Sequence, residues 1–109
     1  MSNETVLNLT LEQANKAIER NAALVRLYQN KDFQNAVLEG YFKDEAVRLV
    51  LAKGNPSMDA PEQQAAIVRD IDGIGSLASY FTAIRHEAAM SEKALKDADE
   101  DRQYVDDAE

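Results

Sequence analysis

The stretch FKDEAVRLVLAKGNPSMDAPE, residues 42–62, contains a predicted helix, its end and the start of the next helix. Apolar side chains in its first half occupy more than one stripe, which predicts a helix over residues 42–53 that is covered on most sides. Gly54 then precedes Pro56, an order typical of helix ends, because glycine accepts the left-handed conformation and proline cannot continue the helix. We therefore predict a turn at Gly54 between two helices.

A second helix is expected directly after this turn. Asp59 can cap its first turn, Pro61 stands where a missing N–H costs little, and Glu62 follows three residues after the cap. Apolar residues then recur at helical spacing as far as Ile71, so we predict a helix over residues 60–71.

The segment DIDGIGS, residues 70–76, is the second predicted break. We interpret Gly73 and Gly75 as a tight turn whose missing side chains let two helices approach closely. A last, long helix is predicted to open at Gly75 or Ser76, and its apolar residues continue at three- and four-residue steps through Leu95.

Two further helices are predicted on the amino-terminal side. Thr10 can cap a helix over residues 10–29, because Gln13 stands three residues later and can reach back to the cap. Residues 30–32 are polar and interrupt this helix. A short helix near Gly40 is predicted from Phe33, Val37, Leu38 and Tyr41, and a bend is expected at Gly40.

Together these segments predict an all-α protein, a small bundle of about four to five helices with a long C-terminal helix and an acidic tail. The predicted organisation is an extended lead-in over residues 1–9, a helical domain over residues 10–96, and an acidic segment over residues 97–109. That last segment either frays into solvent or continues the helix as a partner-binding stripe.

Composition restricts the class of protein. The chain has 109 residues, of which 45% are hydrophobic, enough for one modest core. It contains no cysteine, which excludes disulfides and thiolate metal sites and favours a reducing compartment. We expect neither export by a signal peptide nor a membrane span, because no basic and apolar leader and no long apolar run is present.

The net charge of −8 is concentrated at one end of the sequence. Residues 97–109 contain seven acidic residues and one basic residue, so this segment carries −6 and the other 96 residues carry −2. No basic face for phosphate is expected, and nucleic acid is therefore an unlikely partner.

Three binding motifs were tested against the segment 70–76, and each fails on spacing or charge. An EF-hand starting at Asp70 needs glycine at its sixth position and glutamate at its twelfth, but glycine comes fourth and the twelfth residue is Phe81. A dinucleotide fold would need more chain for its strands. A helix-hairpin-helix contact to DNA would meet the carboxylates of Asp70 and Asp72.

The sequence offers no set of residues from which a catalytic site could be assembled. His86 is the single histidine, so a multi-histidine metal site is excluded, and no nucleophile, base and orienting group can be assembled. The aromatic pairs Tyr41–Phe42 and Tyr80–Phe81 are interpreted as core fillers, because no basic residues alternate with them. The prediction is a protein that is not an enzyme and has no cofactor and no metal.

Two stretches carry a resemblance to a group of known proteins. DFQNAVLEGYFKDEAVRLVLAKGNPSM (32–58) and IVRDIDGIGSLASYFTAI (67–84) resemble small, mostly uncharacterised helical proteins encoded by tailed bacteriophages, some of them near virion genes. The resemblance implies a phage protein in the cytoplasm of a bacterial host or in the virion. It implies virion assembly as the first role and inhibition of a host enzyme as the second.

The resulting hypothesis is a non-enzymatic interaction or assembly protein that associates with itself or docks on a larger virion protein. The candidate interaction residues are Leu95, Ala98, Tyr104 and Val105, where the last predicted helix carries apolar residues beyond the needs of a small core. The alternative is a small inhibitor of a host enzyme or defence system, acting as a sponge for a nucleotide signal or as an acidic DNA mimic.

Overall fold

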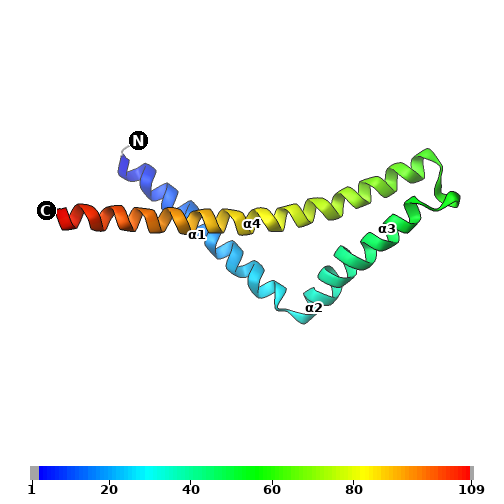
Figure 1. The fold of residues 1–109 in the computed structure, drawn as a ribbon, viewed down its shortest axis with the longest axis horizontal. Coiled ribbons are helices and arrows are strands. Elements are labelled where there is room, and N and C mark those ends of the chain that lie inside the picture. Colours follow the sequence, from blue (N-terminus) through cyan, green and yellow to red (C-terminus); the bar gives the residue numbers. More distant parts are fainter. Residues whose placement is uncertain (1–2, 109) are drawn as a thin grey trace. The chain divides into compact units, whose positions relative to one another are not determined.

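The computed structural model describes the backbone of residues 3–108 and the side chains of residues 10–102. Within this part of the chain every regular element is helical and no strand occurs, which confirms the predicted all-α class. Three long helical segments, rather than four to five, make up the structure (Figure 1). The elements are α1 (Asn3–Tyr28), α2 (Lys31–Phe33), the π-helix η1 (Gln34–Glu45), α3 (Ala46–Lys53), the 3₁₀ turn η2 (Pro56–Met58) and α4 (Pro61–Ala108).

The chain divides into two compact units. The terminal unit consists of Met1–Val25 and Thr82–Glu109, and the middle unit consists of Arg26–Phe81. Because α4 extends from Pro61 to Ala108, its first half belongs to the middle unit and its second half to the terminal unit.

The terminal unit pairs α1 with the second half of α4, and the two helices run in opposite directions (Figure 1). Its buried side chains are Ala14 and Leu24 from α1 and Ile84 and Ala88 from α4. Two of the four are alanines, and small side chains allow helix backbones to approach closely. The described buried residues of this unit therefore form a small contact between the two helices.

The middle unit is built around Phe81. Its ring centroid lies 6.0 Å from that of Tyr28, 6.2 Å from Phe33, 5.9 Å from Phe42 and 6.2 Å from Tyr80. The rings of Tyr28 and Phe42 meet it edge-on, an arrangement that aromatic pairs prefer. Phe42 and Phe81 are half-buried in this cluster, as expected for core fillers, whereas Tyr80 is 54% exposed and the interpretation is wrong for it.

The predicted end of a helix at Gly54 is present, because α3 ends at Lys53. Gly54 has φ −86° and ψ −2°, so the left-handed conformation expected there is not used. A side chain satisfies the end of the helix instead: Nε2 of Gln64 donates to the main-chain oxygens of Lys53 (3.0 Å) and Met58 (2.8 Å). Because the carbonyl group of Lys53 accepts this hydrogen bond, the end of the helix does not require a residue in the left-handed conformation to satisfy it.

The short helix near Gly40 is not separate from the helix after it, because α2, η1 and α3 follow one another without a gap. The segment Gln34–Glu45 has the wider turn of a π-helix. There a Cβ at Gly40 would lie 3.1 Å from the main-chain oxygen of Asn35, five residues earlier. Glycine leaves room for this carbonyl in the widened turn.

The turn predicted at Gly73 and Gly75 is wrong, because both residues lie inside α4 and no described glycine has a positive φ. Helical glycine costs about 1 kcal/mol relative to alanine, which is less than the packing that crosses this segment. Ile67 is buried and Ile71 and Ile74 are half-buried, at steps of four and three residues. This continuous apolar face holds the helix together.

The extended lead-in predicted over residues 1–9 is also corrected, because α1 begins at Asn3. Leu7 stands four residues before Leu11, so the apolar spacing of the helix extends back beyond the capping pair at Thr10. At the other end α4 reaches Ala108, so residues 97–108 are helical.

Candidate interaction surface

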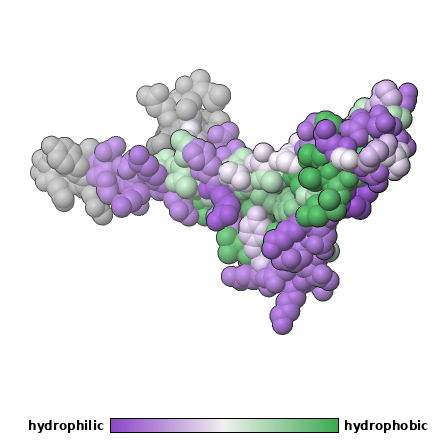
Figure 2. All heavy atoms as spheres, turned by 45° about the vertical axis from the view of Figure 1, so that its right-hand side comes forward, coloured by the Kyte–Doolittle hydropathy of each residue, from purple (hydrophilic) through white to green (hydrophobic). Residues whose placement is uncertain are grey.

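The most exposed apolar side chains of the middle unit lie together on α3. Val47, Val50 and Leu51 are 58%, 63% and 69% exposed. Residues three and four positions apart lie on the same side of a helix, so these three form one face. We call Val47, Val50 and Leu51 the α3 face. Figure 2 shows hydrophobic atoms gathered over this part of the molecule.

The local sequence explains why α3 has an apolar face on each side. Leu49 is 2% exposed and packs into the middle unit, whereas Val47 and Leu51 stand two residues before and after it. Two residues correspond to about 200° around a helix, so they point away from the packed side. The prediction that the helix over residues 42–53 is covered on most sides is therefore wrong for this chain by itself.

Both ends of the α3 face are marked by particular residues. Lys43 stands four residues before Val47, and Gly54 stands four residues after Val50, so each lies in line with the face. The Nζ atom of Lys43 lies 3.1 Å from Oε1 of Glu39, with both side chains more than half exposed. Such an exposed pair is worth little and can be rearranged by a partner.

A polar cleft lies beside α3 within the middle unit, with a volume of about 190 Å³. Its charged lining consists of two guanidinium groups and two carboxylates, and the guanidinium of Arg48 is already paired with Glu45. The hydroxyl of Tyr41 approaches Gly73, where a Cβ would lie 3.6 Å from it. The charges are balanced, so this cleft does not single out an anion or a cation. Its lining residues are Tyr41, Glu45, Arg48, Leu49, Arg69, Asp70 and Gly73.

A second, open cleft of about 420 Å³ lies in the terminal unit, between residues 10–17 of α1 and 87–94 of α4. Small side chains such as Ala14 and Ala17 line it, and Met90 stands 60% exposed at its edge. Nearby in the sequence, Oδ1 of Asn21 is buried without a hydrogen-bond partner. The alanines widen the groove because their side chains do not fill it.

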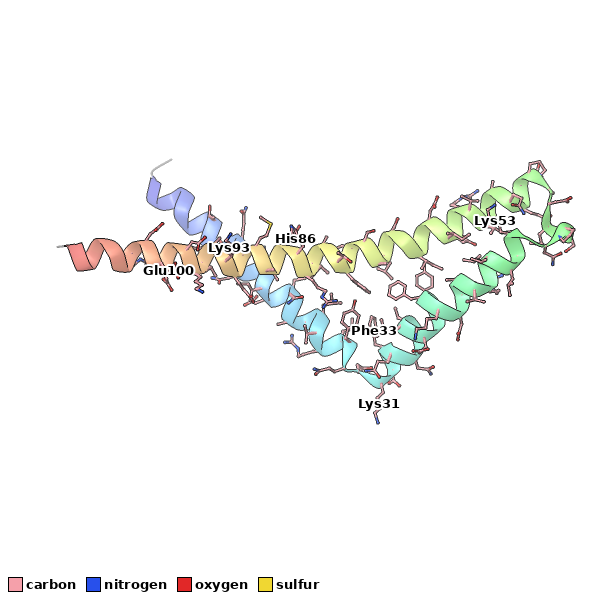
Figure 3. The ribbon with its side chains drawn as sticks, in the orientation of Figure 1. Lys31, Phe33, Lys53, His86, Lys93 and Glu100 are labelled. Atoms are coloured by element: carbon pink, nitrogen blue, oxygen red, sulfur yellow. The ribbon has the colours of Figure 1, made fainter. Side chains whose placement is uncertain are left out.

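Metal-binding side chains do not converge in the described residues, because no group of three or more histidine, aspartate or glutamate side chains there could hold a metal ion. His86 is exposed on α4 (Figure 3).

The structure divides the interaction residues predicted from the sequence. Leu95 and Ala98 are half-buried and continue the spacing of Ala88, so they belong to the face that packs within the terminal unit. The side chains of Tyr104 and Val105 lie outside the described residues. The α3 face was not predicted, although the sequence of residues 42–53 shows apolar side chains on more than one stripe of the helix.

Few described side chains are buried, and none of these is polar or charged. The buried residues are Ala14, Leu24, Leu49, Ile67, Ile84 and Ala88.

No described helix combines the length and the apolar character needed to cross a membrane. No family model matches the chain, and comparisons with curated proteins and with solved structures found no similar protein.

Proposed function

We propose that this chain is a non-enzymatic helical module that acts by binding protein, and that its first partner is another copy of itself. The observation that carries this proposal is the α3 face, where three large apolar side chains of one helix stand more than half exposed. Exposed apolar residues grouped on one face are typical of surfaces that a partner covers.

Covering the α3 face would remove apolar surface from water. Each square ångström of apolar surface so covered contributes about 25 cal/mol before the cost of association.

The resemblance to phage proteins suggests the setting. A self-associating helical module can serve as a building part of a virion, or dock on a larger capsid, portal or tail protein during assembly. The host cytoplasm and the virion are the places where such a protein would be found.

A second candidate function is inhibition of a host protein by acidic mimicry of DNA. The exposed carboxylates of Asp97, Asp99, Glu100 and Asp101 favour it, because they lie close together in the sequence of α4. Figure 3 shows Glu100 on this part of the helix. Binding by these charges would weaken steeply as salt is added, whereas apolar association would not.

Sedimentation velocity of the full chain over a wide concentration range tests the first proposal. We expect a mass of at least two chains, with little dependence on salt. A monomer at every concentration would contradict self-association. If a monomer nonetheless bound a DNA-binding host protein in low salt only, acidic mimicry would replace self-association as the preferred function.

A further inference from the structure

The π-helix η1 joins α2 to α3 in one helical segment of the middle unit (Figure 1). Its twelve residues exceed the single turn to which π-helices are mostly confined. Half of the twelve are alanine, leucine, glutamate, glutamine or lysine, which are among the best formers of the α-helix. The sequence of the segment therefore favours an α-helix, and contacts from outside the segment must hold its wider turn.

Two contacts to Phe81, within the same unit, account for the wider turn. The ring centroid of Phe81 lies 6.2 Å from that of Phe33 and 5.9 Å from that of Phe42. Phe42 follows Phe33 by nine residues, which complete about two and a half turns of an α-helix and would place the two rings on opposite sides. A π-helix takes roughly one residue more for each turn, because its hydrogen bonds reach one residue further, so nine residues complete about two turns. The wider turn thus brings both rings to Phe81.

The same count from Phe33 shows what an α-helical segment would do to α3. In a continuous α-helix Val47 and Leu51 follow Phe33 by about four and five turns, so they lie on the side of Phe33. Phe42 and Leu49 follow it by about two and a half and four and a half turns, so they lie on the opposite side. The structure has the reverse arrangement, because Leu49 is 2% exposed and Leu51 is 69% exposed.

We propose that η1 is a conformational switch, in which the segment Gln34–Glu45 passes between the π-helix of this structure and an α-helix and so exchanges the side of α3 that packs within the middle unit. In the π form Leu49 is buried and the α3 face is exposed. In the α form the side that carries Val47 and Leu51 turns inward and Leu49 turns outward. The chain's own middle unit then covers the α3 face, which explains why α3 is apolar on two sides.

Gly40 gives a way to move this equilibrium with one substitution. A Cβ at Gly40 would lie 3.1 Å from the main-chain oxygen of Asn35, which is closer than an ordinary van der Waals contact. Alanine also favours the α-helix over glycine. Gly40→Ala should therefore disfavour the π form and favour the α form.

The switch would regulate the proposed function, and this consequence alone rests on that function. The π form presents the α3 face to a partner, whereas the α form withdraws it. A partner that binds this face therefore shifts the population towards the π form, by as much as its affinities for the two forms differ. Gly40→Ala should bind such a partner more weakly than the parent.

Hydrogen-bond scalar couplings, measured by NMR on the full chain, test the switch directly because they connect each amide nitrogen to the carbonyl group that accepts its hydrogen bond. In the parent we expect the amides of residues 39–45 to couple to carbonyl groups five residues earlier. In Gly40→Ala we expect coupling to carbonyl groups four residues earlier. Phe81→Leu should have the same effect, because it removes the ring that Phe33 and Phe42 share.

Gly75→Ala is the matched control for Gly40→Ala. It makes the same substitution inside α4, where an added Cβ would meet no atom within 4 Å, and it should keep the couplings of the parent. Circular dichroism confirms that each variant remains helical. The coupling pattern of the parent in both Gly40→Ala and Phe81→Leu would overturn the switch, and so would an α-helical pattern in the parent.

Thiol labelling tests the exchange of faces. The chain has no cysteine, so Leu51→Cys provides a single thiol on the α3 face. At a concentration at which the chain is monomeric, we expect this thiol to react about tenfold more slowly in the Gly40→Ala background, because a buried group reacts only when its surroundings open. Met90→Cys is the control, since Met90 is 60% exposed in the terminal unit, and its rate should be the same in both backgrounds.

The outcomes separate the switch from the proposed function. Equal labelling of Leu51→Cys in the two backgrounds, with α-helical couplings in Gly40→Ala, would overturn the exchange of faces. A parent that never self-associates would contradict the proposed function and leave the switch standing, because labelling is read on monomers and the couplings report hydrogen bonds within one chain.

Discussion

The side-chain amide of Gln64 donates to the main-chain oxygen of Lys53, joining the first turn of α4 to the last turn of α3 across eleven residues. The same nitrogen also donates to the main-chain oxygen of Met58, so it holds both sides of the connecting loop. This single side chain therefore fixes the carboxy-terminal end of α3 and the place where the α3 face ends.

Replacing Gln64 by leucine should destabilise the chain. Both carbonyl groups would lose their donor, and a net loss of about 1–2 kcal/mol is expected in urea unfolding. Gln63→Leu is the control, because the side chain of Gln63 is exposed and makes neither of these contacts. Equal stability of the two variants would show that this contact does not hold the loop.

Gly75→Ala should stabilise the chain by about 1 kcal/mol, because alanine favours helix over glycine. An added Cβ at Gly75 would meet no atom within 4 Å. If the segment formed a turn with positive φ instead, the same substitution would lower the melting temperature. The thermal melt therefore decides between a continuous α4 and the turn predicted from the sequence.

Asn21→Leu should raise the stability of the terminal unit by about 1 kcal/mol, because Oδ1 of Asn21 is buried without a hydrogen-bond partner. Asn15→Leu, at an exposed position of the same helix, provides the comparison and should leave stability nearly unchanged. A loss of stability in Asn21→Leu would mean that the amide has a partner in solution.

Phe81→Ala should cost about 2 kcal/mol, because the half-buried ring of Phe81 contacts four other aromatic rings. Tyr80→Ala should cost far less, since Tyr80 is more than half exposed. Similar unfolding free energies for the two variants would show that Phe81 is not the centre of the middle unit.

Local sequence signals predicted the helical class and the helix end before Gly54, because capping residues and apolar spacing act over a few residues. They failed at Gly73 and Gly75, where packing of one continuous apolar face outweighs the cost of helical glycine. Local signals also did not predict how the helix end at Gly54 is satisfied, because that depends on a hydrogen bond from Gln64 in the following helix.

The candidate surface was only partly predictable for a similar reason. Two apolar stripes over residues 42–53 were evident, but a single sequence does not say whether the second stripe faces the chain's own core or a partner. The structure places Leu49 inside and leaves Val47 and Leu51 outside. Leu95, predicted for a partner, instead continues the packed face of the terminal unit.

The central claim is that a second copy covers the α3 face, and a distance between two copies tests it most directly. The chain has no cysteine, so Arg48→Cys provides a single position for a spin label beside the α3 face. Paired helices lie roughly 8–10 Å apart, so the continuous-wave electron paramagnetic resonance spectrum of the labelled dimer should show dipolar broadening between the two copies. Absence of coupling at position 48 in a sample that sediments as a dimer would contradict the account.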